Sequence, residues 1–598
     1  MDFYGFYTGK IFDAYTYLGA HVEPVQGVSF RTFAPGASKI SLIGEFNNWE
    51  EWTMNRVHDG NFWECYAADA RPGQMYKYRI YAQNGSYVDH CDPYGFGMEL
   101  RPNSASIIRD LSAYQFHDEK WQKSRSDCRE TALNIYELHF GSFKKPSEKA
   151  DDWYSYTEMI EILIPYLKEY GYNYIEIMPL SEHPCDESWG YQNTGFFSPT
   201  SRYGTAEELM QFIDACHQNN IGVIMDFVPV HFAVDAYGLA RYDGTALFEY
   251  PHQDVGVSEW GSCNFMHSRG ETRSFLQSAA NYWLSVYHAD GIRMDAISRI
   301  IYWQGEPARG VNNNAVEFIR EMNRGLKSLH PSAILTAEDS TSYSGVTKSI
   351  DDGGLGFDYK WDMGFMNDTL NYFRTAPEYR SENYHKLTFS MMYYYNDRFL
   401  LPFSHDETVH GKATILQKMY GDYDDKFPQA RALYMYMYAH PGKKLNFMGN
   451  EIGQLREWDE KREQDWFLLK YPVHDAFHRF MKDLNHLYLT CPALSEKDYD
   501  PSGFEWLDCH QEERCIYAFK RSSEKEAVLA VFNFSDKEQA DYELALPEGT
   551  LLTLLLDSNQ DIYGGTAHYV KPVTRKSGKS GAVTLTLPPY CALYFSMK

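Results

Sequence analysis

The amino-acid sequence predicts an α/β protein built around a (β/α)8 TIM barrel, with an N-terminal β-sandwich before it and a C-terminal all-β domain after it. In the middle of the chain, eight short apolar segments alternate with amphipathic helical segments, which is the pattern of a parallel barrel. The flanking regions instead alternate apolar and polar residues between turn residues, as antiparallel sheets do. A chain of 598 residues is also too long for one core, so several domains are expected.

Residues 1–112 are expected to hold an aromatic lead-in followed by the β-sandwich. The segments VSFRTFAP, KISLIGEF and QMYKYRIYA show the period-two alternation of half-buried strands. Trp49 follows two asparagines in a turn, and Trp63 follows Asn61 and Phe62. We expect Trp49 and Trp63 as candidate substrate contacts, because an exposed Trp could stack on a sugar ring; the alternative, that they belong to the sandwich core, stays open.

Residues 113–492 are expected to form the barrel. Helical patterns stand between the strands, for example Phe275, Ala279, Tyr282, Trp283 and Val286 at helical spacing. The eight predicted strands, in chain order, are NIYELHFGSF, YIEIMPL, IGVIMDFV, IRMD, SAILTAEDS, FDYKWDM, FLLPFSHDE and KLNFMGNE.

Two further regions complete the predicted organisation. Residues 231–269, between the third and fourth strands, lack periodicity and are expected to form a loop region over the barrel mouth. Residues 493–598 return to β patterning in RCIYAFKR, AVLAVFNFS, TLLTLLLDS and AVTLTLPPYCALYFSM, which predicts a C-terminal β-sandwich. We expect this last domain to be structural.

The composition narrows the class of partner. The net charge of −26 argues against nucleic acid and anionic membranes, while an aromatic content of 16% suits the flat faces of sugar rings. The chain shows no signal-peptide pattern and no membrane-length apolar run. Its 10 cysteines lack metal or disulfide spacing, so we expect reduced thiols, a cytoplasmic protein and no metal or other cofactor. The oligomeric state is not readable from the sequence.

Four of the predicted strands end in an acidic residue or close to one. Asp226, Asp295, Glu338 and Asp406 each follow an apolar strand segment, and Arg293 precedes Asp295 by two positions. In a barrel of this type the carboxyl ends of the strands meet at one mouth, where active sites are built. Because side chains alternate along a strand, Arg293 and Asp295 are expected on the same face. We therefore expect these acids to cluster, whereas one acid alone would suggest a structural ion pair.

Clustered carboxylates without a phosphate-binding loop suggest either a divalent-cation site or glycoside chemistry. Cation binding would leave Arg293 and two histidines, His231 and His405, without a role. Glycoside chemistry needs one ionised and one protonated carboxyl. Arg293 should keep Asp295 ionised as the nucleophile, and neighbouring negative charge should raise the pKa of Glu338 so that it serves as the acid and base.

These residues lie in motifs that resemble the signature regions of the α-amylase superfamily, also called glycoside hydrolase family 13: DFVPVH, DGIRMDAI, LTAEDS and FSHDE. Longer segments resemble one family within it, the 1,4-α-glucan (glycogen) branching enzymes. They are YTGKIFDAYTYLGAH, YELHFGSF, HPCDESWGYQNTGFFSPTSRYGT, FSHDETVHGK and FMGNEIGQLREWDEKREQDWFLL. The resemblance covers nearly the whole chain and implies a starch-binding-like module at its N-terminal end. Departures are AEDS in place of the commoner AEES, a short segment after the fourth strand, and a single N-terminal sandwich.

The resemblance implies a role for each site residue. Asp295 would be the nucleophile, Glu338 the acid and base, and Asp406 the stabiliser of the transition state. The remaining barrel residues would bind the sugar at the cleavage site or support the residues that do so: Arg293, Asp226, Tyr191, His231 and His405. The implied activity cleaves an α-1,4 bond and transfers the chain to a 6-hydroxyl, in glycogen biosynthesis.

The acids alone do not choose between transfer and hydrolysis, because either water or a sugar hydroxyl can resolve a glycosyl-enzyme intermediate. The expectation of transfer therefore depends on the resemblance. A debranching or trehalose-releasing α-glucan hydrolase and an inactive glucan-binding protein remain as alternatives.

Overall fold

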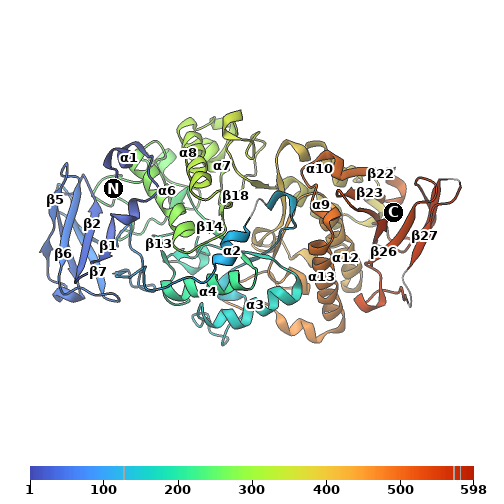
Figure 1. Cartoon of the computed structure of the whole chain (residues 1–598), viewed down its shortest axis with the longest axis horizontal. Coiled ribbons are helices and arrows are strands. Elements are labelled where there is room, and N and C mark those ends of the chain that lie inside the picture. Colours follow the sequence, from blue (N-terminus) through green and yellow to red (C-terminus); the bar gives the residue numbers. More distant parts are fainter. Residues whose placement is uncertain (126–127, 570–572, 580) are drawn as a thin grey trace.

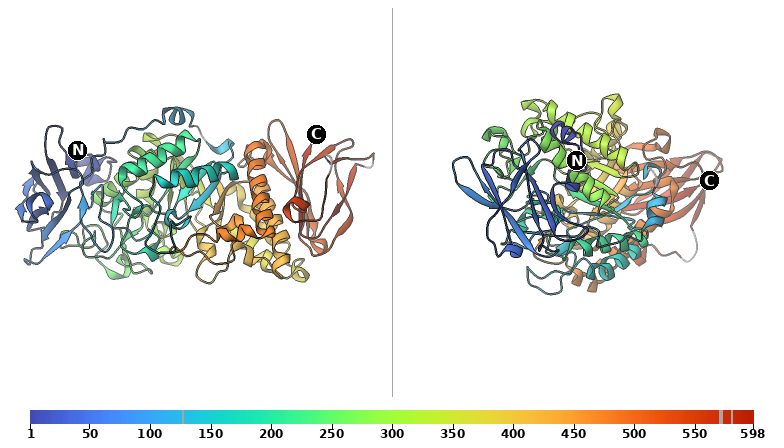
Figure 2. Two further views of the ribbon diagram at one scale, coloured as in Figure 1. Left: turned by 90° about the horizontal axis from the view of Figure 1, so that it is seen from below. Right: turned by 60° about the vertical axis from the view of Figure 1, so that its left-hand side comes forward.

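The computed structural model describes residues 1–125, 128–569, 573–579 and 581–598. The chain forms three parts in a row, with the N-terminal sheets and the C-terminal sheets at opposite ends of a central barrel (Figure 1). The two further views in Figure 2 show the same order. We propose that the domain limits, near residues 112 and 492, fall in the connections between these parts.

The centre of the molecule is a closed barrel of eight parallel strands, which confirms the predicted fold. All eight lie in the predicted segments to within one residue at their first position, and they read as short apolar runs because both of their faces are buried. In order around the barrel they are β10 (Asn134–Leu138), β11 (Tyr174–Ile177), β14 (Gly222–Phe227), β17 (Gly291–Met294), β18 (Ile334–Ala337), β19 (Tyr359–Trp361), β20 (Phe399–Phe403) and β21 (Lys443–Phe447).

Helices surround the barrel and present apolar stripes to it. α4 starts at Thr205, whose side chain accepts a hydrogen bond from the Glu208 N–H while the Glu208 side chain bonds back, an arrangement that satisfies two unpaired N–H groups. The long helices are α3 (Glu158–Tyr170), α4 (Ala206–Gln218), α6 (Gly270–Ser285), α8 (Asn313–Leu329), α9 (Met363–Arg374), α12 (Tyr423–Ala439) and α13 (Pro472–Thr490). Residues 338–358, all of them described, form no α-helix between β18 and β19.

The N-terminal part consists of two antiparallel sheets around an apolar core. One sheet has the order β1-β2-β6-β5, and the other contains β4-β3-β7-β8 with β9 paired to β7. Their bounds are β1 (Gly19–Val22), β2 (Val28–Phe33), β3 (Lys39–Gly44), β4 (Trp52–Thr53), β5 (Asn55–Val57), β6 (Phe62–Ala67), β7 (Met75–Tyr81), β8 (Tyr87–His90) and β9 (Ser106–Ile107).

The residues that precede this sandwich pack against the barrel. The short helix α1 (Phe3–Thr8) contacts α6, and the N–H of Ala14 donates to the Ser278 hydroxyl at 3.0 Å. The Gln277 side-chain amide donates to the carbonyl oxygens of Gly9 and Ile11, both at 3.1 Å. The polar face of α6 is therefore buried under the first residues of the chain.

The C-terminal part is a six-stranded sheet packed on a two-stranded sheet, with the orders β22-β23-β24-β29-β26-β27 and β25-β28. Helices α12 and α13 of the barrel lie against it (Figure 1). Its strands are β22 (Phe504–Gln511), β23 (Ile516–Ser522), β24 (Ala527–Asn533), β25 (Gln539–Ala545), β26 (Leu551–Asp557), β27 (Thr574–Lys576), β28 (Ala582–Leu587) and β29 (Cys591–Met597). No helix in the described part of the chain combines the length and apolarity that crossing a bilayer requires.

Candidate active site

The four acidic residues at the strand ends come together at one mouth of the barrel. A cavity of about 510 Å³ opens there, and Asp295, Glu338 and Asp406 all line it. Its wall also contains His231, His405, Tyr191, Trp189, Trp260, Arg299 and His410. Asp226 and Arg293 lie beneath this layer, both buried.

Arg293 is the centre of the ionic network. Its guanidinium approaches Asp226 at 2.7 Å, Asp295 at 2.9 Å and Glu338 at 3.0 Å. Asp226 and Arg293 face each other because they are paired in the register of the adjacent strands β14 and β17. The guanidinium also lies 4.4 Å from the centroid of the Trp361 ring, which adds a cation–π contact to the ionic network. One cation thus holds three carboxyl groups in fixed positions.

The electrostatics of the nucleophile differ from the expectation. Burial raises the pKa of Asp295 well above its ordinary value; Arg293 opposes this shift, and Glu338 and Asp226 add to it. Burial likewise raises the pKa of Asp226, against the effect of Arg293. Arg293 acts in the predicted direction, but burial and neighbouring negative charge outweigh it, so the expectation of an Asp295 pKa held low by Arg293 is wrong.

Glu338 is positioned by backbone as well as by Arg293. The N–H of Ala296 donates to the Glu338 carboxylate at 2.9 Å, and the N–H of Ile297 donates to the Glu338 carbonyl at 2.9 Å. Ala296 has a φ of 49°, in the left-handed region that is strained for a residue with a Cβ atom. The residue that directly follows Asp295 is thus held in an unfavourable conformation that aims its N–H at Glu338.

His405 lies between two carboxylates. Its Nδ1 lies 2.6 Å from the Glu137 carboxylate, and its Nε2 lies 3.5 Å from Asp406. Burial lowers the pKa of His405, but Glu137 and Asp406 outweigh burial and raise it to about 9. Burial raises the pKa of Asp406, whereas His405, Lys412 and Arg293 together lower it below its ordinary value. Asp406 is therefore an ionised carboxylate, and its side chain is 41% exposed towards the cavity.

Two rings complete the immediate wall. The Tyr191 hydroxyl donates to Asp226 at 2.6 Å, and its ring stacks on His405 with 5.7 Å between centroids. His231 is buried, which lowers its pKa to about 4, and its Nδ1 has no hydrogen-bond partner among the described residues. The Trp260 ring lies 5.2 Å from His231 and reaches the cavity from the segment between β14 and β17. A neutral His231 can donate or accept towards a sugar hydroxyl.

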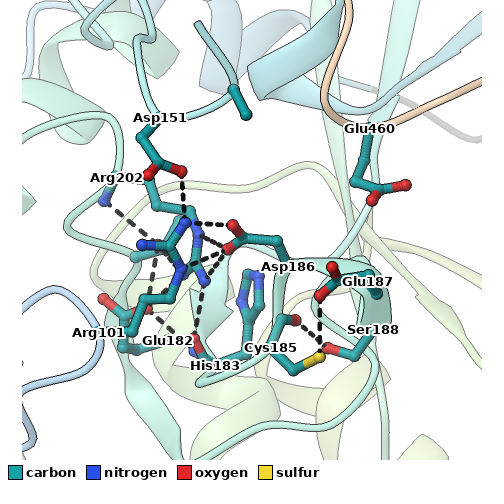
Figure 3. Close-up of polar contacts among 12 residues, drawn as sticks. Arg101, Asp151, Glu182, His183, Cys185, Asp186, Glu187, Ser188, Arg202 and Glu460 are labelled. Atoms are coloured by element: carbon teal, nitrogen blue, oxygen red, sulfur yellow. Dashed lines mark hydrogen bonds and ion pairs between the residues drawn. The ribbon is translucent and has the colours of Figure 1, made fainter.

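The wall that carries Trp189 and Tyr191 is fixed by a separate ionic cluster. Figure 3 shows the side chains of Arg101 and Arg202 converging on Asp186. Arg202 also pairs with the buried Glu182 at 2.7 Å. This cluster fixes the turn that precedes Trp189. It therefore stabilises the part of the cavity wall that contains Trp189 and Tyr191, although Arg101, Arg202 and Asp186 do not line the cavity.

The two tryptophans of the N-terminal module have different surroundings, and neither lines the cavity. Trp63 is only 3% exposed, its indole N–H donates to the Ala34 carbonyl at 3.0 Å, and Arg56 covers its ring. A sugar cannot reach Trp63, so the expectation that it binds substrate is wrong, and this side chain belongs to the sandwich core. Trp49 is 41% exposed, so its role as a sugar contact stays a prediction.

Some residues of the site were not predicted from the sequence. Glu137 positions His405, and Trp189 and Trp260 form much of the cavity wall. A charged residue inside the apolar strand segment NIYEL was a detectable signal for Glu137, since burial of an unpaired charge is unfavourable. Trp189 and Trp260 lie in irregular segments, and no periodic pattern marks them.

Comparison with protein families gives three matches along the chain. Residues 17–95 match carbohydrate-binding module 48, described as the isoamylase N-terminal domain. Residues 148–242 match the α-amylase catalytic domain, and residues 506–598 match the α-amylase C-terminal all-β domain.

Solved structures and curated proteins agree with these matches. The fold resembles a pullulanase from Bacillus acidopullulyticus (TM-score 0.74, 17% identity, covering 97% of this chain and 74% of that one). It also resembles a pullulanase from Anoxybacillus sp. LM18-11 (TM-score 0.75, 16% identity, covering 99% and 89%).

The sequence is 42% identical to the 1,4-alpha-glucan branching enzyme GlgB of Bacillus subtilis strain 168, over 98% of this chain and 96% of that protein. The same enzyme of Bacillus cereus strain G9842 is 42% identical over 98% and 93%. The chain therefore belongs to the family of 1,4-α-glucan branching enzymes.

Proposed function

We propose that Asp295, Glu338 and Asp406 catalyse the branching of α-1,4-glucan. The chain cleaves an α-1,4 bond with retention and transfers the released segment to a 6-hydroxyl, which makes an α-1,6 branch. The observation that carries this assignment is the contact of Arg293 with both Asp295 and Glu338, at 2.9 and 3.0 Å, on the wall of one cavity. The family membership supports transfer over hydrolysis.

The first half of the reaction forms a glycosyl-enzyme. An Asp295 carboxylate oxygen attacks C1 of the sugar, the bond from C1 to O4 breaks, and Glu338 gives its proton to O4. Glu338 is positioned for this transfer by its contacts with the Arg293 guanidinium and the Ala296 N–H.

The second half reverses these roles. The 6-hydroxyl of an acceptor chain gives its proton to Glu338 while its oxygen attacks C1, and the bond to Asp295 breaks. Asp406 remains ionised and faces the positive charge that develops on the ring. The protonated His405 and the neutral His231 bind ring hydroxyls, Tyr191 stacks on the ring, and Asp226 holds Arg293 and Tyr191 in place.

The assignment is tested with Asp295→Asn, because the amide keeps the shape of the side chain but cannot form the ester. We expect branching of amylose to fall about 10⁴-fold or more, with an unchanged melting temperature and glycogen affinity. The matched control is Asp69→Asn, at an exposed turn of the N-terminal sandwich, which should retain full activity.

The readout is linkage analysis of the products, together with iodine staining and reducing-end titration. New α-1,6 linkages with few new reducing ends identify branching by the wild-type protein. A steep rise in reducing ends would identify a hydrolase, and glycogen binding without turnover would identify an inactive binding protein. Substantial branching by Asp295→Asn would show that another group is the nucleophile.

A further inference from the structure

A second cavity, of about 400 Å³, lies beside the catalytic cavity. Its walls come from the connection after β18, from the end of β19 and from the region of α10 (His385–Tyr393). Ser340 lines both this cavity and the catalytic one. The two cavities therefore adjoin, two residues beyond Glu338.

An irregular connection forms one wall of the cavity. Residues 338–358 connect β18 to β19 with only a 3-10 turn, at Ile350–Asp352. Within this connection, the segment Ser340-Thr341-Ser342-Tyr343-Ser344 lines the cavity with hydroxyl groups. Loops that replace regular elements at a barrel mouth are common places for binding sites.

Asp362 is a buried carboxylate whose two oxygens have different surroundings. One carboxylate oxygen of this buried side chain accepts from the Phe365 N–H and from the Tyr393 hydroxyl, both at 2.8 Å. The other oxygen has no hydrogen-bond partner among the described residues. Burial raises the pKa of this carboxyl to about 6. A buried acceptor of this kind is unfavourable unless a ligand or an ordered water occupies the cavity beside it.

The other charged groups of the cavity have partners already. Lys360 lies 3.0 Å from Asp339 and donates to the Thr341 carbonyl at 2.9 Å. Asp397 accepts from the N–H and the hydroxyl of Thr347, both at 2.8 Å. The free binding capacity is therefore one carboxylate oxygen among hydroxyl and amide groups, which favours a neutral polyhydroxylated ligand over an ion.

An aromatic surface continues from the cavity. Phe389 on α10 is 55% exposed, and its ring lies 5.7 Å from that of Tyr393 in an edge-to-face arrangement. Tyr395 is also exposed and adjoins the lining residue Asn396. Carboxylate and hydroxyl groups beside exposed aromatic faces are the combination that recognises sugars, through their hydroxyls and their apolar ring faces.

We propose that this cavity is an α-glucan subsite, in which Asp362 accepts a hydrogen bond from a sugar hydroxyl of a chain that also reaches the catalytic cavity through Ser340. The inference rests on the proposed function, because it assumes that the protein acts on an α-glucan. It concerns a part of the polymer away from the bond that is cleaved.

The direct test is a crystal of the Asp295→Asn protein soaked with maltotriose. We expect a glucose ring in the cavity, with one hydroxyl within hydrogen-bond distance of the free Asp362 oxygen. Only water beside Asp362 in a crystal whose catalytic cavity contains maltotriose would overturn the proposal.

The kinetic test fills the cavity with Ser342→Trp, at an exposed position of the loop. We expect the KM for amylose to rise about fivefold or more with kcat within about twofold, since hydrogen bonds to a distant ring are lost while the acids are untouched. The matched control is Ser328→Trp, on an exposed position of α8, which should behave as the wild type.

Asp362→Asn is the second variant, because it keeps an oxygen for the Phe365 N–H but removes the free acceptor. A similar rise in KM is expected, and an unchanged KM in both variants would contradict the subsite. Failure of the proposed function is distinguishable, because the wild-type protein would then form no α-1,6 linkages in the same assay.

Discussion

Replacement of Glu137 by Gln should move the alkaline limit of activity. Glu137 does not itself line the cavity, but its carboxylate lies 2.6 Å from Nδ1 of the lining residue His405. The glutamine oxygen can still accept that hydrogen bond, whereas the negative charge is lost. His405 then faces burial without its main compensating charge, and its pKa should fall to 6.5 or below.

The size of the expected effect follows from the shift in the pKa of His405. A rise from 6.5 to about 9 corresponds to about 3 kcal/mol in favour of the protonated ring. At pH 7.5 the wild-type ring is protonated and donates from both nitrogens, while the variant ring is mostly neutral and keeps its proton on Nδ1. Loss of one charged donor to Asp406 or to a sugar hydroxyl should lower kcat/KM about tenfold or more.

The raised pKa of His405 also makes the free energy of unfolding depend on pH. The pKa of His405 is raised in the folded state, so its contribution to the free energy of unfolding is fully present below pH 6.5 and is lost as the pH rises through 9. The variant should therefore lose stability relative to the wild type most strongly below pH 6.5, and the difference should shrink towards pH 9.

The assay is the pH profile of amylose branching for both proteins, with a histidine NMR titration of His405. We expect the alkaline limb near pH 9 in the wild type and near pH 6.5 in the variant. The control is Glu176→Gln, because Glu176 is paired with Glu137 in the strand register and burial raises its pKa well above the usual value, which favours the neutral form that glutamine resembles. Coincident profiles for wild type and Glu137→Gln would refute this role of Glu137.

Three further changes test other parts of the structure. Trp49→Ala should weaken glycogen binding measured by affinity electrophoresis, with little effect on cleavage of short oligomers; equal affinity would remove Trp49 from the binding surface. Trp63→Ala should lower the free energy of unfolding by about 3–5 kcal/mol in a denaturant titration without a selective effect on glycogen binding, since it creates a core cavity. Arg202→Met should lower the free energy of unfolding by a similar 3–5 kcal/mol, because the substitution leaves the buried Glu182 without its cation and removes one cation from Asp186. A free energy of unfolding within about 1 kcal/mol of the wild-type value would contradict this role of Arg202.

The barrel was predictable because its strands are apolar on both faces and end in charged residues. Asp295 and Glu338 directly follow a strand and Asp406 lies three residues beyond one, so the topology alone brings them to one mouth. Chain order and side-chain alternation determine that arrangement, and both are visible in the sequence.

Other features depend on contacts that no local pattern records. The pKa of Asp295 reflects the sum of burial, Arg293 and Glu338, and the sequence indicated the charges without the degree of desolvation. Trp49 and Trp63 have similar surroundings in the sequence, but only the sheet pairing of β6 turns Trp63 inward. One wall of the cavity beside Asp362 is an irregular connection, and sequence periodicity gives little information about irregular segments.

The contact between α6 and the first residues of the chain limits where the protein can be truncated. Ser278 and Gln277 use backbone groups of residues 9–14 as their hydrogen-bond partners. Removing residues 9–14 would expose the polar side chains of Ser278 and Gln277 on α6. The same truncation would remove the contacts of α6 with the segment that precedes the sandwich. A trimmed catalytic core should therefore retain residues 1–18, expressed in one chain or supplied as a separate peptide, and their loss should reduce thermal stability of the barrel itself.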